Sequence, residues 1–202
     1  PICNMTRIVQ DTNIGGWHHF SSFNRGKIYD RWPYADNQMD GFTHWSHIGG
    51  KGKIILDGDF LRLNKCANDD ERRSQVSLQL IAGGPVTIAD TPETIGNLDK
   101  FYTNEELLAL NTDGFIGKPL SDEIDSEGSC IWYGTMSNGD VVMAMFNREE
   151  APRKMSVNLS EIGLSGEYKV RDLWKHADES AVESVFTVTV PRHGCKVVKL
   201  TK

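Results

Sequence analysis

Two short apolar runs alternate with polar, helix-like segments between residues 53 and 120. KIIL (53–56) ends at Asp57 and suits a strand buried on both faces, and PVTIAD (85–90) is a second run of the same kind. Each run is followed by a segment with helix-start signals. This order predicts parallel strands joined by right-handed crossovers.

Three positions carry the signals of a helix start. Asn68 and Thr103 each have a Glu three residues on, which is the arrangement of a capping box, and Thr91 precedes a proline. Gly83-Gly84 follows the apolar positions of the first segment and ends that helix. We therefore expect helices after residues 68, 91 and 103.

The pattern changes to alternating residues and tight turns after about Ser121. Asn138-Gly139, flanked by CIWYGTM and VVMAMFN, is the strongest hairpin signal in the chain. Four further alternating segments follow: RKMSVNL, EYKVRDLW, VFTVTV and CKVVKL. Their spacing is typical of an antiparallel β-sandwich, so we expect an α/β region at 1–121 and an all-β domain at 122–202.

The α/β region has too few strands to make a stable sheet by itself. Residues 12–50 are rich in Gly, His, Trp and Asn, and their weak periodicity predicts long loops and at most one helix. The region is then either a small unusual α/β layer or the end of a larger barrel whose first strands lie before Pro1. The pattern alone leaves both interpretations open.

Composition narrows the classes of partner. The net charge of −6 and the pI near 5.5 argue against a broad cationic surface, and so against nucleic acid or an anionic membrane as a partner. No apolar run reaches the roughly 20 residues of a membrane span. The four cysteines form no C-x-x-C pair and are expected to be buried thiols, with a Cys130–Cys195 disulfide as the alternative in an oxidising compartment.

The histidines do not have the spacing of a metal site. His18-His19 would point to opposite faces of an extended chain, and with His44 and His47 they match no known ligand set. We expect hydrogen-bonded or surface histidines, no metal and no cofactor.

Acidic residues follow the predicted strands, where ligands of parallel sheets bind. Asp57 and Asp59 come after KIIL, and Asp90 ends PVTIAD, so all three are expected at one rim. The alternative is that they cap turns or helices. Arg7 and Asp11, four residues apart, either belong to such a site or form a surface ion pair of little energetic consequence.

Aromatic residues crowd the Gly-rich region before these strands. An aromatic face beside hydrogen-bonding acids suits a sugar ring, although aromatic residues also fill ordinary cores. The residues concerned are Trp17, Phe20, Phe23, Trp32, Tyr34, Phe42 and Trp45.

Four stretches, in order, resemble the C-terminal half of glycoside hydrolase family 27, the α-galactosidases and α-N-acetylgalactosaminidases also called melibiases. CNMTR with Asp11 resembles the segment after barrel strand six, and ILDGDFL resembles the Asp-Pro-Asp-Met-Leu motif after strand seven. ERRSQVSLQLIAGGPVTIADT resembles helix seven and strand eight, and NEELLALNTD resembles the last barrel helix. The region with EYKVRDLW, VTVPRHG and KVVKL resembles the C-terminal antiparallel domain.

The chain also departs from the family pattern near the sugar pocket. Gly58 stands in place of the motif's Pro, and Phe60 stands in place of its Met. The segment from Asp30 to Lys53 has no clear counterpart in the family. These departures bear on the preferred sugar.

The resemblance implies the C-terminal part of a (β/α)8 barrel followed by an antiparallel β-sandwich, in a retaining hydrolase of α-galactosides or related α-linked sugars. By resemblance the acid/base is Asp11, and the substrate-binding residues are Arg7, Trp17, Asp57, Asp59 and Phe60. The family's nucleophile follows strand four, before Pro1, so the chain needs the rest of the barrel as its partner and is expected to be inactive alone. The family also suggests a secreted, periplasmic or lysosomal protein.

An alternative from another class is a noncatalytic carbohydrate-binding β-module with a short α/β appendage. Convergence of Asp11, Asp59 and Asp90 on one pocket would favour the enzyme, and a binding face confined to strands after Ser129 would favour the module. A serine or cysteine hydrolase is disfavoured, because the chain has no G-x-S-x-G motif and no evident Cys–His pair.

Overall fold

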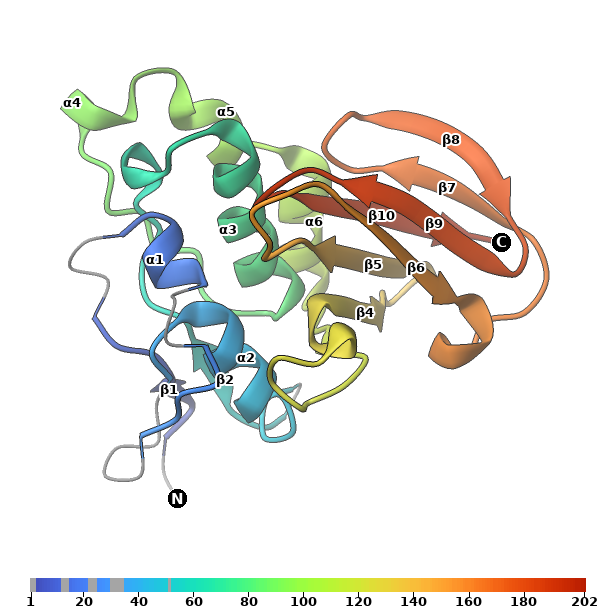
Figure 1. Cartoon of the computed structure of the whole chain (residues 1–202), viewed down its shortest axis with the longest axis horizontal. Helices are drawn as coiled ribbons and strands as arrows, with labels where there is room; N and C mark the ends of the chain where they lie inside the picture. The colour runs from blue at the N-terminus through green and yellow to red at the C-terminus, as the bar shows by residue number, and fades with distance from the viewer. Residues whose placement is uncertain (1–2, 12–14, 22–24, 30–34, 51) are drawn as a thin grey trace.

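The computed structural model describes residues 3–11, 15–21, 25–29, 35–50 and 52–202 (Figure 1). Helices and one pair of parallel strands make up the N-terminal part, and antiparallel strands make up the C-terminal part. None of the helices in the described residues is long and apolar enough to cross a membrane.

The parallel pair consists of β1 (Met5–Arg7) and β2 (Ile55–Asp57), with Arg7 opposite Asp57. The strand predicted at KIIL therefore begins two residues later than expected. It is also buried on one face only, because Leu56 is 4% exposed whereas Ile55 is 43% exposed. The expectation of burial on both faces is wrong for this strand, since the described residues cover only one of its faces.

The segment PVTIAD does not form the expected second strand. Ile88 makes a single parallel bridge to Leu61, and its side chain is 46% exposed. A strand needs a neighbour along its length to satisfy its backbone groups, and the loop that carries Leu61 supplies only one such position. The parallel direction of the bridge agrees with the predicted order of strands.

The rest of the N-terminal part consists mainly of helices and loops (Figure 1). The helices are α1 (Trp17–Phe20), α2 (Gln38–Trp45), α3 (Asp69–Ile81), α4 (Pro92–Ile95), α5 (Asp99–Tyr102) and α6 (Glu105–Asp113). Turns of 3₁₀ helix lie at Leu63–Lys65, Gly96–Leu98, Glu127–Cys130 and Leu159–Ile162. The described residues between 12 and 50 contain two helices, α1 and α2, where one was expected.

Two of the three helix starts predicted from the sequence are observed in the structure. The Asn68 side chain accepts the N–H of Glu71 at 2.9 Å and caps α3, and α4 begins at Pro92 after Thr91. The third start is one residue later than expected, because Asn104 rather than Thr103 caps α6.

Glu106, the residue predicted to complete the capping box with Thr103, binds other residues instead. Glu106 accepts hydrogen bonds from Arg171 at 2.6 and 2.8 Å, and its carboxylate also meets His176 at 2.9 Å. A long-range ion pair therefore displaces the local capping box. The guanidinium of Arg171 lowers the pKa of Glu106 below its usual value.

The C-terminal part is an antiparallel β-sandwich, as predicted. Its larger sheet has the strand order β3–β4–β5–β10–β7–β8, and β6 pairs with β9 in the smaller sheet (Figure 1). The strands are β3 (Lys118–Pro119), β4 (Ile131–Thr135), β5 (Val141–Phe146), β6 (Arg153–Asn158), β7 (Tyr168–Asp172), β8 (Ala177–Val182), β9 (Val185–Val190) and β10 (Cys195–Thr201). The first strand of the sheet precedes residue 122, where the all-β domain was expected to begin.

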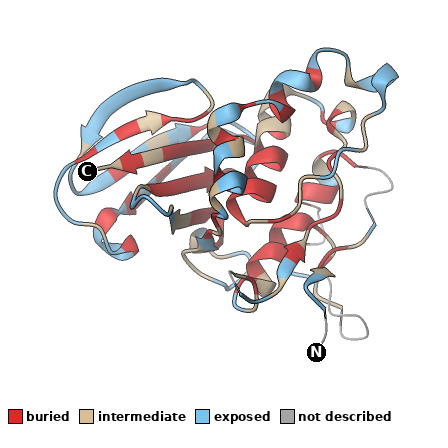
Figure 2. Ribbon diagram, turned by 180° about the vertical axis from the view of Figure 1, so that it is seen from behind, coloured by how far each residue is buried: buried red, intermediate tan, exposed pale blue. Residues whose placement is uncertain are grey.

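The β4–β5 hairpin confirms the strongest local signal in the sequence. Its turn contains Asn138-Gly139, and Gly139 has the left-handed φ of 92° that favours glycine. The hairpin lies inside the larger sheet, whereas β8 at the edge of that sheet is exposed (Figure 2).

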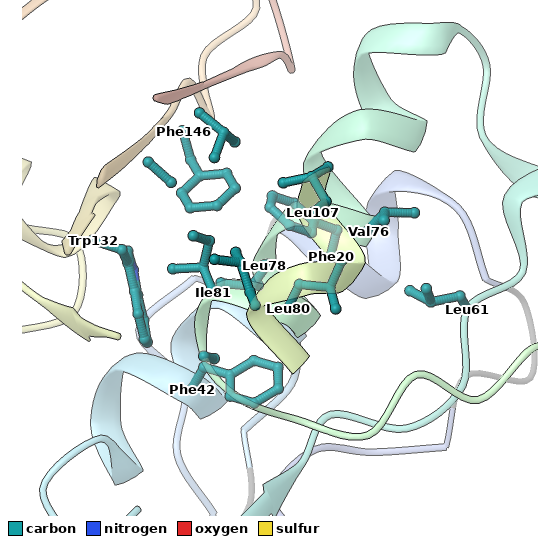
Figure 3. Packing of buried hydrophobic residues seen from close by; sticks show 14 of the residues in the cluster. Phe20, Phe42, Leu61, Val76, Leu78, Leu80, Ile81, Leu107, Trp132 and Phe146 are labelled. Carbon is teal, nitrogen blue, oxygen red and sulfur yellow. The ribbon is translucent and has the colours of Figure 1, made fainter. Parts of the chain in front are cut away.

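The hydrophobic core continues from the helices into the sheet. Leu78 and Ile81 of α3 belong to the same buried cluster as Trp132 of β4 and Phe146 of β5 (Figure 3). A second cluster, which includes Met143 of β5, fills the space between the two sheets. The α/β part and the sandwich are therefore joined by shared core rather than by a linker.

The four cysteines are free thiols. Cys66 and Cys130 are buried, as predicted, and Cys195 is half-buried, but Cys3 is exposed, so the expectation was wrong there. Cys130 lies in the core between the sheets and Cys195 packs against the core around α3. The alternative disulfide between them therefore does not form.

A buried ion pair ties α2 to the end of β5. The side chains of Asp40 and Arg148 are 0% and 1% exposed, and their nearest charged atoms are 2.8 Å apart, in ionic rather than hydrogen-bond geometry. Asp40 also accepts the N–H of Gly26 at 2.7 Å, and Arg148 donates to the hydroxyl of Ser21 at 2.7 Å. The pair therefore organises the chain before α2 as well as α2 itself.

We predict that Arg148→Met destabilises the protein by about 3–5 kcal/mol, because it leaves Asp40 as an unpaired buried charge. The matched control is Arg153→Met, since Arg153 pairs with Glu127, whose side chain is 86% exposed. That variant should cost about 0–1 kcal/mol. Urea unfolding measures both changes, and equal effects of the two variants would contradict the prediction.

Candidate active site

The acid loop, residues 57–60, follows β2 and turns sharply. Asp59 has a left-handed φ of 69°, which is uncommon for a residue other than glycine. The carboxylate of Asp57 accepts the N–H of Asp59 at 2.8 Å and so supports this turn. The conformation brings the Asp59 side chain back toward β1, where it is 8% exposed.

Arg7 joins two carboxylates at the end of β1. Its guanidinium nitrogen Nη2 lies 2.7 Å from Asp11 and 2.5 Å from Asp59. The two carboxylates have different surroundings, since the side chain of Asp11 is 78% exposed and that of Asp59 is buried. The arrangement therefore offers a solvent-facing carboxyl group that can exchange a proton and a buried carboxylate held by a cation.

Asp90 does not join this cluster. Its carboxylate accepts the N–H groups of Leu63 and Asn64 at 2.8 and 3.1 Å, and the hydroxyl of Tyr102 at 2.6 Å. Burial and the Asp90 carboxylate raise the pKa of Tyr102, so its hydroxyl stays protonated and donates. The capping alternative is the one that the structure shows for Asp90.

The other residues expected in the sugar pocket lie on two sides of the site. Phe60 is half-buried, directly after Asp59 in the acid loop. Trp17 instead stacks on Phe20 and on His193, with ring centroids 4.7 and 4.1 Å apart. Trp17 thus packs between α1 and the turn before β10, in contacts that do not include Arg7 or the two carboxylates.

The aromatic residues of the described region are mostly core. Phe20 and Phe42 are 0% exposed, and Trp45 packs against the same cluster. Phe23, Trp32 and Tyr34 lie outside the residues that the structure describes. Their contribution to a sugar-binding surface stays a prediction.

His19 is a buried neighbour of the site that the sequence did not reveal. It is 7% exposed, and its Nε2 has no hydrogen-bond partner among the described residues. Burial lowers the pKa of His19 to about 4, against the opposing effects of the Asp59 charge and a hydrogen bond with the Gly58 backbone. The imidazole is therefore neutral at pH 7. The preceding residue, His18, is exposed.

The remaining histidines of the sequence pattern are not a metal centre in this structure. His47 is exposed, and its Nδ1 lies 2.9 Å from the carbonyl oxygen of His44. Across the described part of the chain, no three His, Cys, Asp or Glu side chains gather as metal ligands.

Comparisons with known proteins show which proteins the chain resembles. Residues 126–200 match the family described as the alpha galactosidase C-terminal beta sandwich domain. The chain is 28% identical over 183 residues to alpha-galactosidase 2 of Arabidopsis thaliana, covering 88% of this chain and 45% of that protein. A family 27 β-L-arabinopyranosidase from Geobacillus stearothermophilus shares the fold, with 23% identity and a TM-score of 0.66 over 81% of this chain and 40% of its own.

Isomalto-dextranase of Arthrobacter globiformis is similar over nearly the whole chain. The two sequences are 38% identical over 207 residues, which is 98% of this chain and 32% of that protein. The structure of the Arthrobacter globiformis T6 enzyme complexed with panose matches with a TM-score of 0.90 and 36% identity, over 98% of this chain and 34% of the other. These matches confirm the resemblance to the C-terminal region of glycoside hydrolase family 27. The chain spans about a third to a half of the length of these relatives.

The buried His19 predicts a specific dependence of stability on pH. The folded-state pKa of about 4 lies below the ordinary 6.5, so the unfolded chain binds more protons between these pH values. Stability is full above pH 6.5 and should fall by up to about 3 kcal/mol as the pH drops toward 4. Urea unfolding across this range should show a flatter pH dependence for His19→Gln, whereas the exposed-site control His47→Gln should keep the slope. An unchanged slope in His19→Gln would refute the prediction.

Proposed function

We propose that this chain is the C-terminal portion of a retaining glycoside hydrolase that acts on α-linked sugars. In this proposal β1, β2 and the segment around Ile88 are the sixth, seventh and eighth strands of a (β/α)8 barrel. The observation that carries the proposal is the Arg7–Asp11–Asp59 cluster at the carboxyl ends of two parallel strands. Ligands of parallel α/β sheets bind at that end.

Each residue of the cluster has a role that fits its surroundings. Asp11, which is exposed, is the acid that protonates the departing oxygen and later the base that activates water. Arg7 holds Asp11 and Asp59 in place, and the buried Asp59 accepts a hydrogen bond from a sugar hydroxyl. Asp57 shapes the turn that presents Asp59, and Phe60 borders the pocket.

The covalent step requires a second carboxylate beside the anomeric carbon, about 5–5.5 Å from the acid in retaining enzymes. Asp59 pairs with Arg7, Asp57 accepts a hydrogen bond within its own turn, and Asp90 accepts three hydrogen bonds from Leu63, Asn64 and Tyr102. By resemblance to the family, whose nucleophile follows barrel strand four, we place the nucleophile in the rest of the barrel, upstream of Pro1.

Two observations indicate the sugar: the identity to the relatives, and the residues near the site that differ from the family motif. Identity over nearly the whole chain is higher to isomalto-dextranase than to alpha-galactosidase 2, at 38% against 28%. Gly58 and Phe60 also differ from the α-galactosidase motif at the edge of the site. We propose an α-linked glucan of the isomalto type as the preferred substrate, and an α-galactoside as the second candidate.

A noncatalytic carbohydrate-binding module has less support. Of the three acids whose convergence was expected for the enzyme, Asp11 and Asp59 meet at Arg7 and Asp90 does not. The pair of Asp11 and Asp59 lies at the parallel strands, whereas the binding face of a module was expected on strands after Ser129.

The acid role of Asp11 is tested in the intact enzyme by Asp11→Asn. We expect kcat/KM to fall by about 10²–10⁴-fold on an isomalto-oligosaccharide, whose leaving oxygen is basic, and much less on an aryl α-glucoside. The control is Asp178→Asn, because Asp178 is also an exposed partner of an arginine but lies in β8. Equal losses on both substrates, or none, would remove Asp11 from the acid role.

The second test concerns residues 1–202 alone. Without a positioned nucleophile the covalent step is lost, so we expect no turnover of aryl α-glucosides or α-galactosides above buffer. A mechanism-based label that traps the glycosyl-enzyme should also leave every Asp and Glu of the chain unmodified. Covalent labelling of any of them would show that the nucleophile lies within this chain.

A further inference from the structure

Two buried glutamines hold the backbone of the acid loop. Gln38, the first residue of α2, donates its side-chain amide to the carbonyl oxygen of Gly58 at 2.7 Å. Gln79, in the last turn of α3, donates to the carbonyl oxygen of Asp59 at 2.9 Å. Both glutamines are at most 1% exposed, so these hydrogen bonds are shielded from water.

Gly58 leaves no space for a side chain at the centre of this loop. A Cβ at Gly58 would lie 2.4 Å from Cε2 of Phe42 and 2.9 Å from Nε2 of Gln79. The family motif has a proline at this position, and a proline ring would occupy the volume that Phe42 and Gln79 fill here. Phe42 and Gln79 can therefore pack at this position only because residue 58 is a glycine.

Replacing a proline by a glycine also removes a constraint on the backbone. Proline fixes its own φ, whereas glycine adopts many conformations and loses more entropy on folding. Asp59, the next residue, is held at a left-handed φ of 69°, a conformation that persists only when its surroundings impose it. Gln38 and Gln79 supply such a constraint, because they donate to the carbonyl oxygens of the two peptides that flank the Cα of Asp59.

We infer that Gln38 and Gln79 are positioning residues that fix Asp59 against Arg7 and Asp11, in place of the proline of the family motif. The inference rests on the proposed function for the role of Asp59. Gln38 and Phe42 both come from the segment Asp30–Lys53, for which the family offers no counterpart. Through α2, this segment thus contributes to the geometry of the acid loop.

A double-mutant cycle in the intact enzyme tests this role. Gln79→Leu should lower kcat/KM on an aryl α-glucoside by about 10–100-fold, the loss expected when a reacting group is misplaced by ~1 Å. In an Asp59→Ala background the same change should cost less than about twofold, because the residue that Gln79 positions is gone.

Gln75→Leu is the matched control on the same helix. Gln75 is 2% exposed and donates its side-chain amide at 2.7 Å to the backbone carbonyl oxygen of Gly16, away from the acid loop. Each leucine variant removes one buried side-chain-to-backbone hydrogen bond, and Gln75→Leu also removes the weak hydrogen bond from the Cys66 thiol at 3.5 Å, so Gln75→Leu should lower the melting temperature at least as much as Gln79→Leu. Any loss of kcat/KM in Gln75→Leu should be the same with Asp59 or Ala at position 59.

Hydrogen exchange measured by mass spectrometry gives a second readout that needs no turnover. Amides of residues 57–61 should exchange faster in Gln79→Leu than in the parent enzyme, and Gln75→Leu should leave them unchanged. Unaltered exchange in Gln79→Leu would overturn the inference.

The kinetic outcomes separate this inference from the proposed function. If Asp59→Ala alone leaves kcat/KM unchanged, the proposed role of Asp59 fails, and the positioning role fails with it. If Asp59→Ala lowers kcat/KM and the effect of Gln79→Leu is the same in both backgrounds, only the positioning role is overturned. Coupling between positions 59 and 79, with none between 59 and 75, supports both.

Discussion

The structure depends on one buried helix whose polar side chains must all find partners inside the protein. Every residue of α3 from Ser74 to Ile81 is buried, so no face of this stretch is open to water. Burying a hydroxyl or an amide donor without a hydrogen-bond partner costs free energy of folding. Each serine and glutamine in this stretch therefore needs a partner on a neighbouring element. The pairs are Ser74 with the carbonyl of His193, Gln75 with that of Gly16, Ser77 with the indole of Trp174, and Gln79 with the carbonyl of Asp59.

Through these four hydrogen bonds α3 contacts the sandwich at His193 and Trp174, the residue before α1 at Gly16, and the acid loop at Asp59. His193, between β9 and β10, also meets Glu71 near the start of α3 at 2.8 Å and stacks on Trp17. On the other side of the site, the ion pair of Arg148 with Asp40 places α2, which carries Gln38. The sandwich thus supports the two helices, α2 and α3, that donate hydrogen bonds to the backbone of the acid loop.

Local signals in the sequence predicted local structure well. The Asn138-Gly139 hairpin, the Asn68 cap and the alternation of the sandwich strands depend on residues within a few positions of each other. The segment 85–90 failed because a strand is defined by its neighbours, and Ile88 has one bridge only. The start of α6 failed because Glu106 is drawn to Arg171, 65 residues away, which no local pattern reveals.

The same limit applies to the site. The pairing of Arg7 with Asp11 was one of the two alternatives suggested by their four-residue spacing. The contact of Arg7 with Asp59 spans 52 residues and was not predicted, because the family resemblance assigned both residues to the sugar pocket without pairing them. His19 and the two glutamines had no signal of their own. The one indirect sign was Gly58 in place of a proline, because a lost constraint in a loop implies that other residues supply it.

Asp59 and Asp90 show how surroundings, rather than position along the strands, decide what an acid can do. Both come just after a segment in parallel pairing, and the sequence placed them at the same rim. Asp90 accepts hydrogen bonds from two backbone N–H groups and from a phenol hydroxyl, so its carboxylate stabilises the turn at Leu63. The Asp59 backbone carries the structural contacts, through Asp57 and Gln79, while its carboxylate meets a half-exposed arginine. The carboxylate of Asp90 therefore serves the local fold, whereas the carboxylate of Asp59 meets the arginine that also pairs with Asp11.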